Sequence, residues 1–395
     1  MKAFLILEDG TVFEGTHIGA DKEIISEIVF NTSMAGYLEV LTDPSYAGQA
    51  VCMTYPLIGN YGICRDDCES ERPWPDGFIV RELSRIPSNF RCDCTIQEYL
   101  EENGVPGIAG IDTRALTKIL REKGTMNGML TTNEAYDLNE VLSKLKEYTT
   151  GKVVEKVTCK AKYVVAPTTE LAQNGPLSGA ARFDKEAYEK GVREPKPALV
   201  TELSGQGLKV ALLDLGAKRN IARSLAERGC EVTVYPAGTP AQEIIDDNPD
   251  GIMLSNGPGD PKECTGVIAE IKKLYDTEIP IFAICLGHQL MALATGADTH
   301  KMKYGHRGGN HPVKDLMTGR VYISSQNHGY VVDTDKLDPS VAVPAFINVN
   351  DGTNEGLSYT GKNIFTVQFH PEACPGPQDS GYLFDRFIHM MRGEN

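Results

Sequence analysis

The sequence predicts an α/β protein with a C-terminal doubly wound, mostly parallel sheet and a separate N-terminal α+β domain. Two observations predict this fold class. From residue 209 to 284, short apolar segments alternate strictly with amphipathic helical segments, whereas strand and helix signals are mixed before residue 150. The 395 residues are enough for two or three domains of about 100–200 residues each. We therefore expect domains over 1–150 and 209–395, joined by a linker over 151–208.

The N-terminal domain is expected to begin with strands. Residues 2–7 and 11–14 are predicted strands around Asp9-Gly10, a dipeptide that favours a tight hairpin turn. Residues 24–30 form a further apolar strand. No nucleotide-binding motif accompanies these strands.

Capping residues predict three helices in the same domain. Thr95 and Glu98 form a capping box that opens a short helix. Asp112 caps a second helix, which Gly124 ends, and Asp137 caps a third. The linker is different, because it is rich in Pro and Gly and shows no sustained apolar periodicity. One short helix near 184–190 is the regular structure expected there.

The C-terminal domain is predicted from its regular alternation, which means parallel strands with covering helices. The predicted strands cover residues 210–214, 231–235, 251–255, 280–284, 320–326, 341–349 and 363–369, and the predicted helices cover 218–228, 240–247, 263–275 and 380–391.

The charge and the hydropathy pattern exclude several classes of protein. With 39 Lys plus Arg and 54 Asp plus Glu, the formal charge is 39 − 54 = −15, which makes a nucleic-acid backbone a poor partner. No apolar stretch approaches the ~18 residues of a membrane span, and the first residues do not resemble a secretory signal. We therefore expect a cytoplasmic protein that binds neither membrane nor nucleic acid.

The ten cysteines fit reduced thiols in that compartment. Cys64, Cys68, Cys92 and Cys94 fall close together, so a four-thiolate zinc site is an alternative. Their spacings are not those of a zinc ribbon, and ordinary thiols are the favoured interpretation.

Cys285 is the leading candidate for a nucleophile. A buried strand runs directly into it and a helix begins directly after it, so the side chain is held out at the carboxyl end of the sheet. The helix N-terminus favours thiolate, the N–H of Leu286 points where an oxyanion could form, and Gly287 lets the helix approach the sheet. The alternative is an inert buried thiol at a strand end.

His370 and Glu372 are candidates for the base and its orienting group. A strand ends at His370, Pro371 breaks it, and residues two apart in an extended segment face the same side. Glu372 could therefore hold the imidazole so that its other nitrogen faces sulfur. A surface His-Pro turn is the alternative.

A glycine-rich turn over residues 255–261 directly follows a buried strand. It lacks the Gly-Lys-Ser/Thr end of a phosphate loop, and its two prolines remove N–H donors. Gly257 and Gly259 instead fit a turn that supplies a second oxyanion donor and binds substrate. The histidines between 300 and 311 leave a metal site open, but Gly305, Gly308 and Gly309 favour a loop.

These motifs resemble the three signatures of class I glutamine amidotransferases, over residues 255–261, 284–289 and 370–372. Other stretches resemble the small, glutamine-hydrolysing subunit of carbamoyl-phosphate synthase. They cover residues 30–37, 41–46, 108–114, 218–220, 305–313 and 326–329. Two positions differ from the family pattern: Ala283 stands where the family usually has Gly, and Tyr330 stands where it often has Phe.

The resemblance implies that Cys285, His370 and Glu372 form a triad that hydrolyses L-glutamine. The glutamine-binding residues that it implies are Ser45, Gly257, Gly259, Leu286, Gln289, Asn327, Gly329 and Tyr330. Because Ser45 belongs to the other domain, the site is expected at the domain interface.

A large synthetase subunit is the implied partner, in a heterodimer or a higher oligomer of heterodimers. It would carry ATP and Mg²⁺ and use the ammonia, through an internal channel, to make carbamoyl phosphate for arginine and pyrimidine biosynthesis. This chain has no ATP-binding motif, which agrees with that division, and no cofactor or metal is expected in it. Two rivals remain: an amidotransferase of another synthase or a free glutaminase, and a catalytically silent scaffold subunit.

Overall fold

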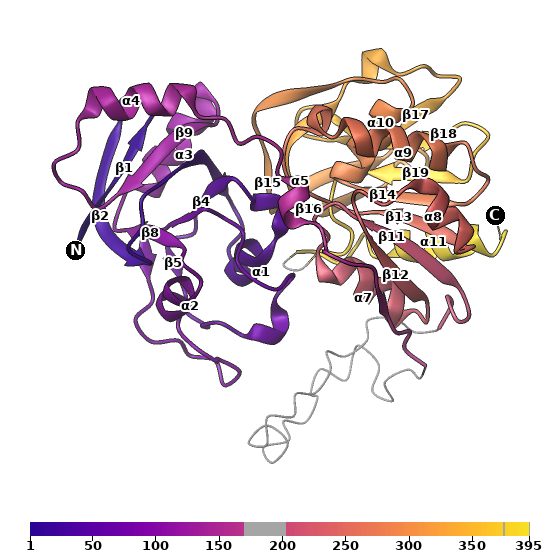
Figure 1. Ribbon diagram of the computed structural model, residues 1–395, viewed down its shortest axis with the longest axis horizontal. Helices are drawn as coiled ribbons and strands as arrows, with labels where there is room; N and C mark the ends of the chain where they lie inside the picture. The colour runs from indigo at the N-terminus through magenta and orange to yellow at the C-terminus, as the bar shows by residue number, and fades with distance from the viewer. Residues whose placement is uncertain (170–202, 374–375, 395) are drawn as a thin grey trace.

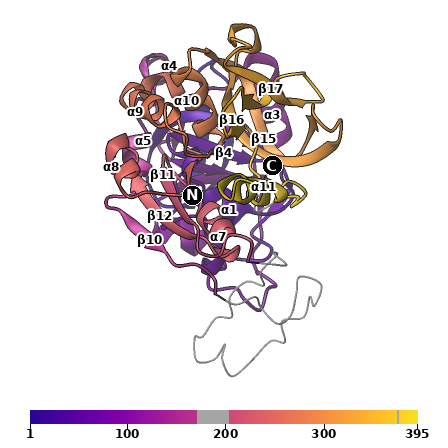
Figure 2. The ribbon, with the colours of Figure 1, turned by 90° about the vertical axis from the view of Figure 1, so that its right-hand side faces the viewer.

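A computed structural model of the chain describes residues 1–169, 203–373 and 376–394. Figure 1 shows two parts side by side, an N-terminal part over about the first 150 residues and a C-terminal part built from the rest. Figure 2 views the molecule from its C-terminal side. No described helix is long and apolar enough to cross a membrane.

A closed barrel forms the N-terminal part, with the strand order β1-β2-β8-β6-β4-β3-β9. Its strands are β1 (Lys2–Leu7), β2 (Val12–Gly19), β3 (Ile24–Asn31), β4 (Gln49–Met53), β6 (Gly77–Ile79), β8 (Pro106–Ala109) and β9 (Met126–Thr131), and β5 (Leu57–Ile58) pairs with β7 (Glu82–Leu83) beside it. The predicted hairpin is present, with Lys2 opposite Thr16, but β2 is longer than expected.

The helices of this part are α1 (Tyr37–Thr42), α2 (Ile96–Glu102), α3 (Thr113–Lys123) and α4 (Leu138–Glu147), with short 3₁₀ turns η1 (Pro44–Tyr46) and η2 (Arg65–Asp67). The capping box is confirmed: the Thr95 side chain accepts from the Glu98 N–H, and Glu98 accepts from the Thr95 N–H. Asp112 and Asp137 cap α3 and α4 as predicted.

A ten-stranded sheet forms the C-terminal part, in the order β10-β12-β11-β13-β14-β19-β18-β17-β15-β16. The strands are β10 (Tyr163–Val165), β11 (Lys209–Asp214), β12 (Glu231–Pro236), β13 (Gly251–Leu254), β14 (Ile281–Ile284), β15 (Thr299–Asp315), β16 (Val321–Val332), β17 (Ala342–Asn348), β18 (Asn354–Tyr359) and β19 (Ile364–Val367). From β12 to β19 the neighbours are parallel, and the strands beyond β19 are antiparallel.

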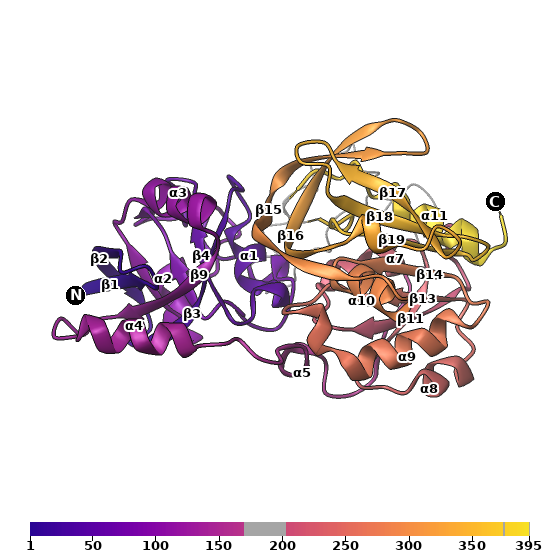
Figure 3. The same cartoon turned by 90° about the horizontal axis from the view of Figure 1, so that it is seen from above.

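Helices cover both faces of this sheet, which confirms the doubly wound prediction. They are α5 (Val154–Val157), α7 (Arg219–Glu227), α8 (Ala241–Asp246), α9 (Thr265–Tyr275), α10 (Leu286–Ala294) and α11 (Tyr382–Met391), with η3 (Pro261–Glu263) and η4 (Thr334–Lys336). One apolar core lies under α8, α9 and α10, and a second lies under α7 and α11. Figures 2 and 3 show these two sets of helices on opposite sides of the parallel strands.

The structure differs from the sequence prediction in three places. Residues 300–311, expected as a loop, belong to the long strand β15, whose pairing with β16 shifts at two irregularities. Strand β18 was not predicted. The range 151–208 contains α5 and β10, and β10 joins the large sheet beside β12. The helix expected near 184–190 lies outside the described residues.

Candidate active site

Cys285 occupies the sharp turn between β14 and α10. Its φ of 53° and ψ of −104° lie outside the regions that L residues normally adopt. Among the described non-glycine residues, only Asn248 shares a positive φ. The turn is fixed by its backbone, because the Cys285 N–H donates to Val367 O at 2.8 Å and its carbonyl accepts from Gln289 N at 3.2 Å. A strained strand–turn–helix of this kind presents a nucleophile.

The surroundings of the thiol are buried and close-packed. A Cβ on Gly287 would lie 2.6 Å from Leu254 O, so only glycine lets α10 approach β13 this closely, as the sequence suggested. The Cys285 side chain lies 3.7 Å from Asn327 O. Burial raises the pKa of the Cys285 thiol, and Lys218 and the N–H of Leu286 oppose that rise. The resting group is therefore a thiol that needs a base.

His370 lies at the same edge of the sheet as Cys285. Strands β14 and β19 are parallel neighbours with Ile284 opposite Val367, and His370 follows three residues later. Its N–H donates to Ser325 O at 2.9 Å, which anchors the segment against β16. The sequence predicted this shared edge because Cys285 and His370 each follow a strand of one proposed sheet.

The imidazole of His370 is held by Glu372. Its Nδ1 lies 2.7 Å from Glu372 Oε1, while Nε2 is buried and has no hydrogen-bond partner among the described residues. A carboxylate at Nδ1 leaves Nε2 free to accept a proton. The His370–Glu372 pair therefore has the arrangement of an oriented base.

Lys218 is a second partner of Glu372 that sequence reasoning did not assign. Its Nζ lies 2.6 Å from Glu372 Oε1, and both side chains are buried. Burial acts to raise the pKa of Glu372, but the charges of Lys218 and His370 outweigh it and lower that pKa to about 2. Glu372 is therefore ionised at neutral pH despite its burial.

The N-terminal part reaches into this site through η1. Asp43 caps η1 by accepting from the Ser45 N–H at 2.9 Å. Across the interface, Asn327 Nδ2 donates to Asp43 at 3.0 Å and Asn256 Nδ2 donates to the Ser45 hydroxyl at 2.8 Å. Asn256 also accepts from the Lys218 N–H at 3.0 Å. The site is thus shared between the two parts, as the placement of Ser45 implied.

A cavity of about 320 Å³ opens beside Cys285, between the two parts of the chain. Of the eight residues predicted to bind glutamine, Leu286 alone is absent from its lining. The predicted residues that line it are Ser45, Gly257, Gly259, Gln289, Asn327, Gly329 and Tyr330. The cavity therefore gathers most of the residues that the sequence proposed from two distant regions.

Arg307 also lines this cavity, and sequence reasoning missed it. The guanidinium is buried and donates to Tyr304 O at 2.7 Å, while Nε has no described partner. Sequence reasoning missed Arg307 because it interpreted residues 300–311 as a loop, which gives no strand register for this side chain. Once β15 is recognised, its register places Arg307 opposite Asn327.

A much smaller cavity, of about 20 Å³, adjoins His370. His370, Asn327 and Lys218 line it, together with Ser325 of β16 and Ser33 of the N-terminal part. Asn327 borders both cavities. Of the triad candidates, the large cavity therefore adjoins Cys285 and the small cavity adjoins His370.

His306, His328 and Glu355 bring their ligand atoms within 4.8 Å of one another, the one such group of three among the described residues. Hydrogen bonds already engage both nitrogens of His328, and His306 Nε2 pairs with Asp351 at 2.8 Å. Burial would lower the pKa of His306, but Glu355 and Asp351 raise it. These contacts fit a buried network in which His306 lies between the carboxylates of Asp351 and Glu355.

The cysteines that left a zinc site open do not assemble one. In the described ranges, no three of Cys64, Cys68, Cys92 and Cys94 bring their sulfurs together as a ligand group. Asn89 donates to Cys64 Sγ, and burial raises the pKa of Cys64 to about 11.

Comparisons with known proteins match both parts of the chain. Residues 211–390 match the family described as "Glutamine amidotransferase class-I", and residues 5–130 match "Carbamoyl-phosphate synthase small chain, CPSase domain". Together these matches extend over most of the sequence.

Full-length relatives agree with both family matches. The chain is 49% identical over 388 residues to a protein of Clostridium perfringens named "Carbamoyl phosphate synthase small chain", covering 98% of this chain and 99% of that one. Proteins with the same name from Fusobacterium nucleatum and Listeria monocytogenes are 48% and 46% identical. Those alignments cover 97% and 100% of this chain and 96% and 98% of the relatives.

Proposed function

Since this chain belongs to the carbamoyl phosphate synthase small chains, and is a glutamine amidotransferase subunit of that ligase, we propose that Cys285, His370 and Glu372 carry out its glutamine hydrolysis. The observation that carries the proposal is the buried His370–Glu372 pair, whose free Nε2 lies at the same sheet edge as the strained Cys285. The products are glutamate and ammonia.

Each residue has a distinct role in the proposed reaction. His370 takes the proton of the Cys285 thiol as sulfur attacks the side-chain amide carbon of glutamine. The resulting oxyanion is stabilised by the N–H groups of Leu286 and Gly257, and His370 returns the proton to the leaving ammonia. Water then attacks the thioester while His370 removes its proton, and glutamate leaves from the regenerated thiol.

Lys218 helps to keep Glu372 ionised during this catalytic cycle. The imidazolium of His370 forms while Glu372 stays ionised, and Lys218 keeps that carboxylate charged in a buried place. We assign Lys218 as a positioning residue, because it acts on His370 only through Glu372.

The 320 Å³ cavity is the proposed glutamine site. Arg307 supplies a buried positive charge that suits the α-carboxylate, and Glu27 of the same lining suits the α-amino group. The eight residues predicted from the sequence surround the rest of the substrate, with Leu286 acting through its N–H.

The 20 Å³ cavity behind His370 is the proposed exit for ammonia toward the large chain of the synthase. Ammonia is about the size of water, and a cavity of this volume holds about one such molecule. The large chain, with ATP and Mg²⁺, then makes carbamoyl phosphate from bicarbonate and ammonia for arginine and pyrimidine biosynthesis. We place this activity in the cytoplasm and assign no cofactor to the small chain.

Trapping of the thioester tests the triad directly: the chain reacts with labelled glutamine, acid stops the reaction, and the label bound to the protein is measured. We expect acid-stable label on the wild-type chain and none on Cys285→Ser, whose ammonia release should fall by about 10²–10⁴-fold. Cys94→Ser is the matched control, because that thiol lies in the N-terminal part, and it should retain both label and activity. Wild-type ammonia release by Cys285→Ser would overturn the assignment.

A further inference from the structure

We propose that one exposed apolar face at the end of the large sheet is the surface on which the large synthase chain docks. The face, called here the hairpin face, consists of Pro312, Lys314, Val321, Ile323, Ile347 and Val349. The proposal deepens the proposed function, since it states where ammonia leaves this chain for its partner.

The strand register places these residues on one side of β15, β16 and β17. Lys314 lies opposite Val321 on one neighbouring strand and opposite Ile347 on the other. Pro312 lies opposite Ile323, and its carbonyl accepts from Val349 N at 2.9 Å. Directly opposed residues of antiparallel strands share a face, so the six side chains form one contiguous surface.

This surface is apolar and open to solvent. Val321, Ile323 and Val349 are 49%, 41% and 50% exposed. The other face of the same strands is already packed, because Val313 and Phe346 are buried in the core under α11. An antiparallel sheet normally turns a polar face to water, so an apolar second face indicates a partner.

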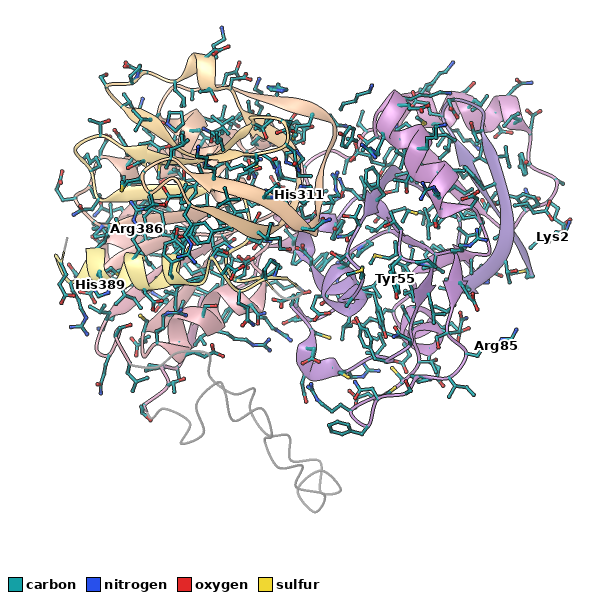
Figure 4. All side chains as sticks on the ribbon, turned by 180° about the vertical axis from the view of Figure 1, so that it is seen from behind. Lys2, Tyr55, Arg85, His311, Arg386 and His389 are labelled. Atoms are coloured by element: carbon teal, nitrogen blue, oxygen red, sulfur yellow. The ribbon has the colours of Figure 1, made fainter. Side chains whose placement is uncertain are left out.

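The edge of the sheet adds a second reason. Strand β16 is the last strand of the order; its ladder is with β15, and its other edge forms one isolated bridge, at Ser325 with His370, which leaves the edge at Val321 and Ile323 outside that bridge. Unprotected edge strands associate with other chains. Among the described residues, no helix or loop buries Val321 or Ile323 at this edge. Figure 4 shows the broad β15–β16 ribbon from behind, with His311 labelled next to the first residue of the hairpin face.

The position of the small cavity identifies the occupant as the large chain. Ser325, which lines the small cavity beside His370, follows Ile323 by two residues on β16, so the cavity begins next to the hairpin face at the point where the pairing with β15 shifts register. A chain seated on Val321 and Ile323 is therefore positioned to receive what leaves that cavity. A second copy of this chain would have no use for the ammonia.

The positive charge at the centre of this face indicates which side chains the partner surface should carry. Lys314 is exposed at its centre and forms no ion pair within the described ranges, although the chain carries a net charge of −15. The complementary surface is an apolar patch with carboxylates near its middle. A basic partner patch would not fit.

Two substitutions test the docking surface. Ile323→Glu and Val349→Glu place negative charge where the proposal expects partner carboxylates, and each should weaken binding of the large chain by about tenfold or more. Val164→Glu is the matched control, because Val164 is 55% exposed on β10, at the opposite edge of the same sheet. Binding is measured by calorimetry, with thermal unfolding to verify folding.

The outcomes separate this proposal from the triad. Titrations use the chain carrying Cys285→Ser, so binding is read without catalysis. In the active background, Ile323→Glu should retain basal glutamine hydrolysis within about twofold and lose its stimulation of carbamoyl phosphate synthesis. Wild-type binding by both variants overturns the proposal. So does a variant that abolishes self-association while leaving large-chain binding intact, since the face would then hold a second copy.

Discussion

Lys218 sets the charge of the candidate triad from outside it. One ammonium, 7% exposed, offsets the burial of a carboxylate that is itself completely buried. Sequence reasoning found Cys285, His370 and Glu372 because each follows a strand in a recognisable motif. It did not assign Lys218 or Asn256, since their roles arise from contacts between segments that are distant in the chain.

Replacing Lys218 by Met should move the acid limb of glutamine hydrolysis to higher pH. Without the ammonium, burial dominates and the pKa of Glu372 rises from about 2, so protonation removes the partner of His370 at a pH where the wild type is active. We expect a shift of at least about one pH unit in the profile of kcat/KM. Lys218→Arg retains the charge and should shift it less, and identical profiles would contradict the assignment.

At the scale of elements, the sequence predicted the parallel strands and capped helices well. Those elements have strong local signals, namely apolar runs for buried strands and capping side chains for helices. It did not predict β15, because the strand combines polar residues with Gly305 and Gly308 at positive φ and shifts register twice. The sequence also did not predict that the N-terminal strands close into a barrel, because the closing pair, β1 with β9, joins residues more than 100 positions apart.

The turn at Cys285 predicts an unusual order of stability between two inactive variants. Cys285→Gly should be more stable than Cys285→Ala by about 1 kcal/mol, because glycine adopts φ 53°, ψ −104° without the strain that a Cβ imposes. Urea denaturation measures the difference. In contrast, Ala283→Gly, within strand β14, should lower the unfolding free energy of the chain by about 1 kcal/mol relative to the wild type. Equal stability of the two Cys285 variants would argue against a strained turn.

For the whole molecule, buried polar groups join the two parts. Glu69 of the N-terminal part accepts from Asn220 N at 3.1 Å, and its backbone carbonyl accepts from Arg219 N at 2.8 Å. Burial raises the pKa of Glu69 to about 7, although Lys218 opposes the rise. The junction therefore contains a carboxyl group that titrates near neutral pH.

Glu69 should make the folded chain less stable as pH rises from about 4.5 to 7. Across that window the folded state holds a proton that the unfolded state, with an ordinary pKa of 4.5, has released. The contribution of Glu69 to the unfolding free energy should therefore fall by roughly 1–3 kcal/mol with increasing pH, so the wild type should lose that much stability relative to Glu69→Gln; buried His288, His311 and His328, whose pKa values are lowered, add an opposite slope that both proteins share. Denaturant titrations at pH 5 and 8 measure this. Exposed Glu71 supplies the control, because Glu71→Gln should keep the wild-type slope.

The two cavities beside His370 and Cys285 differ sixteenfold in volume, 320 Å³ against 20 Å³. In the proposed reaction this difference sorts the products by size. Glutamate is too large for the small cavity and must return through the mouth by which glutamine entered, whereas ammonia fits either route. The small cavity then admits ammonia and excludes glutamate, so glutamate accumulating at the mouth of the large cavity slows the arrival of the next glutamine and leaves the small cavity open to ammonia.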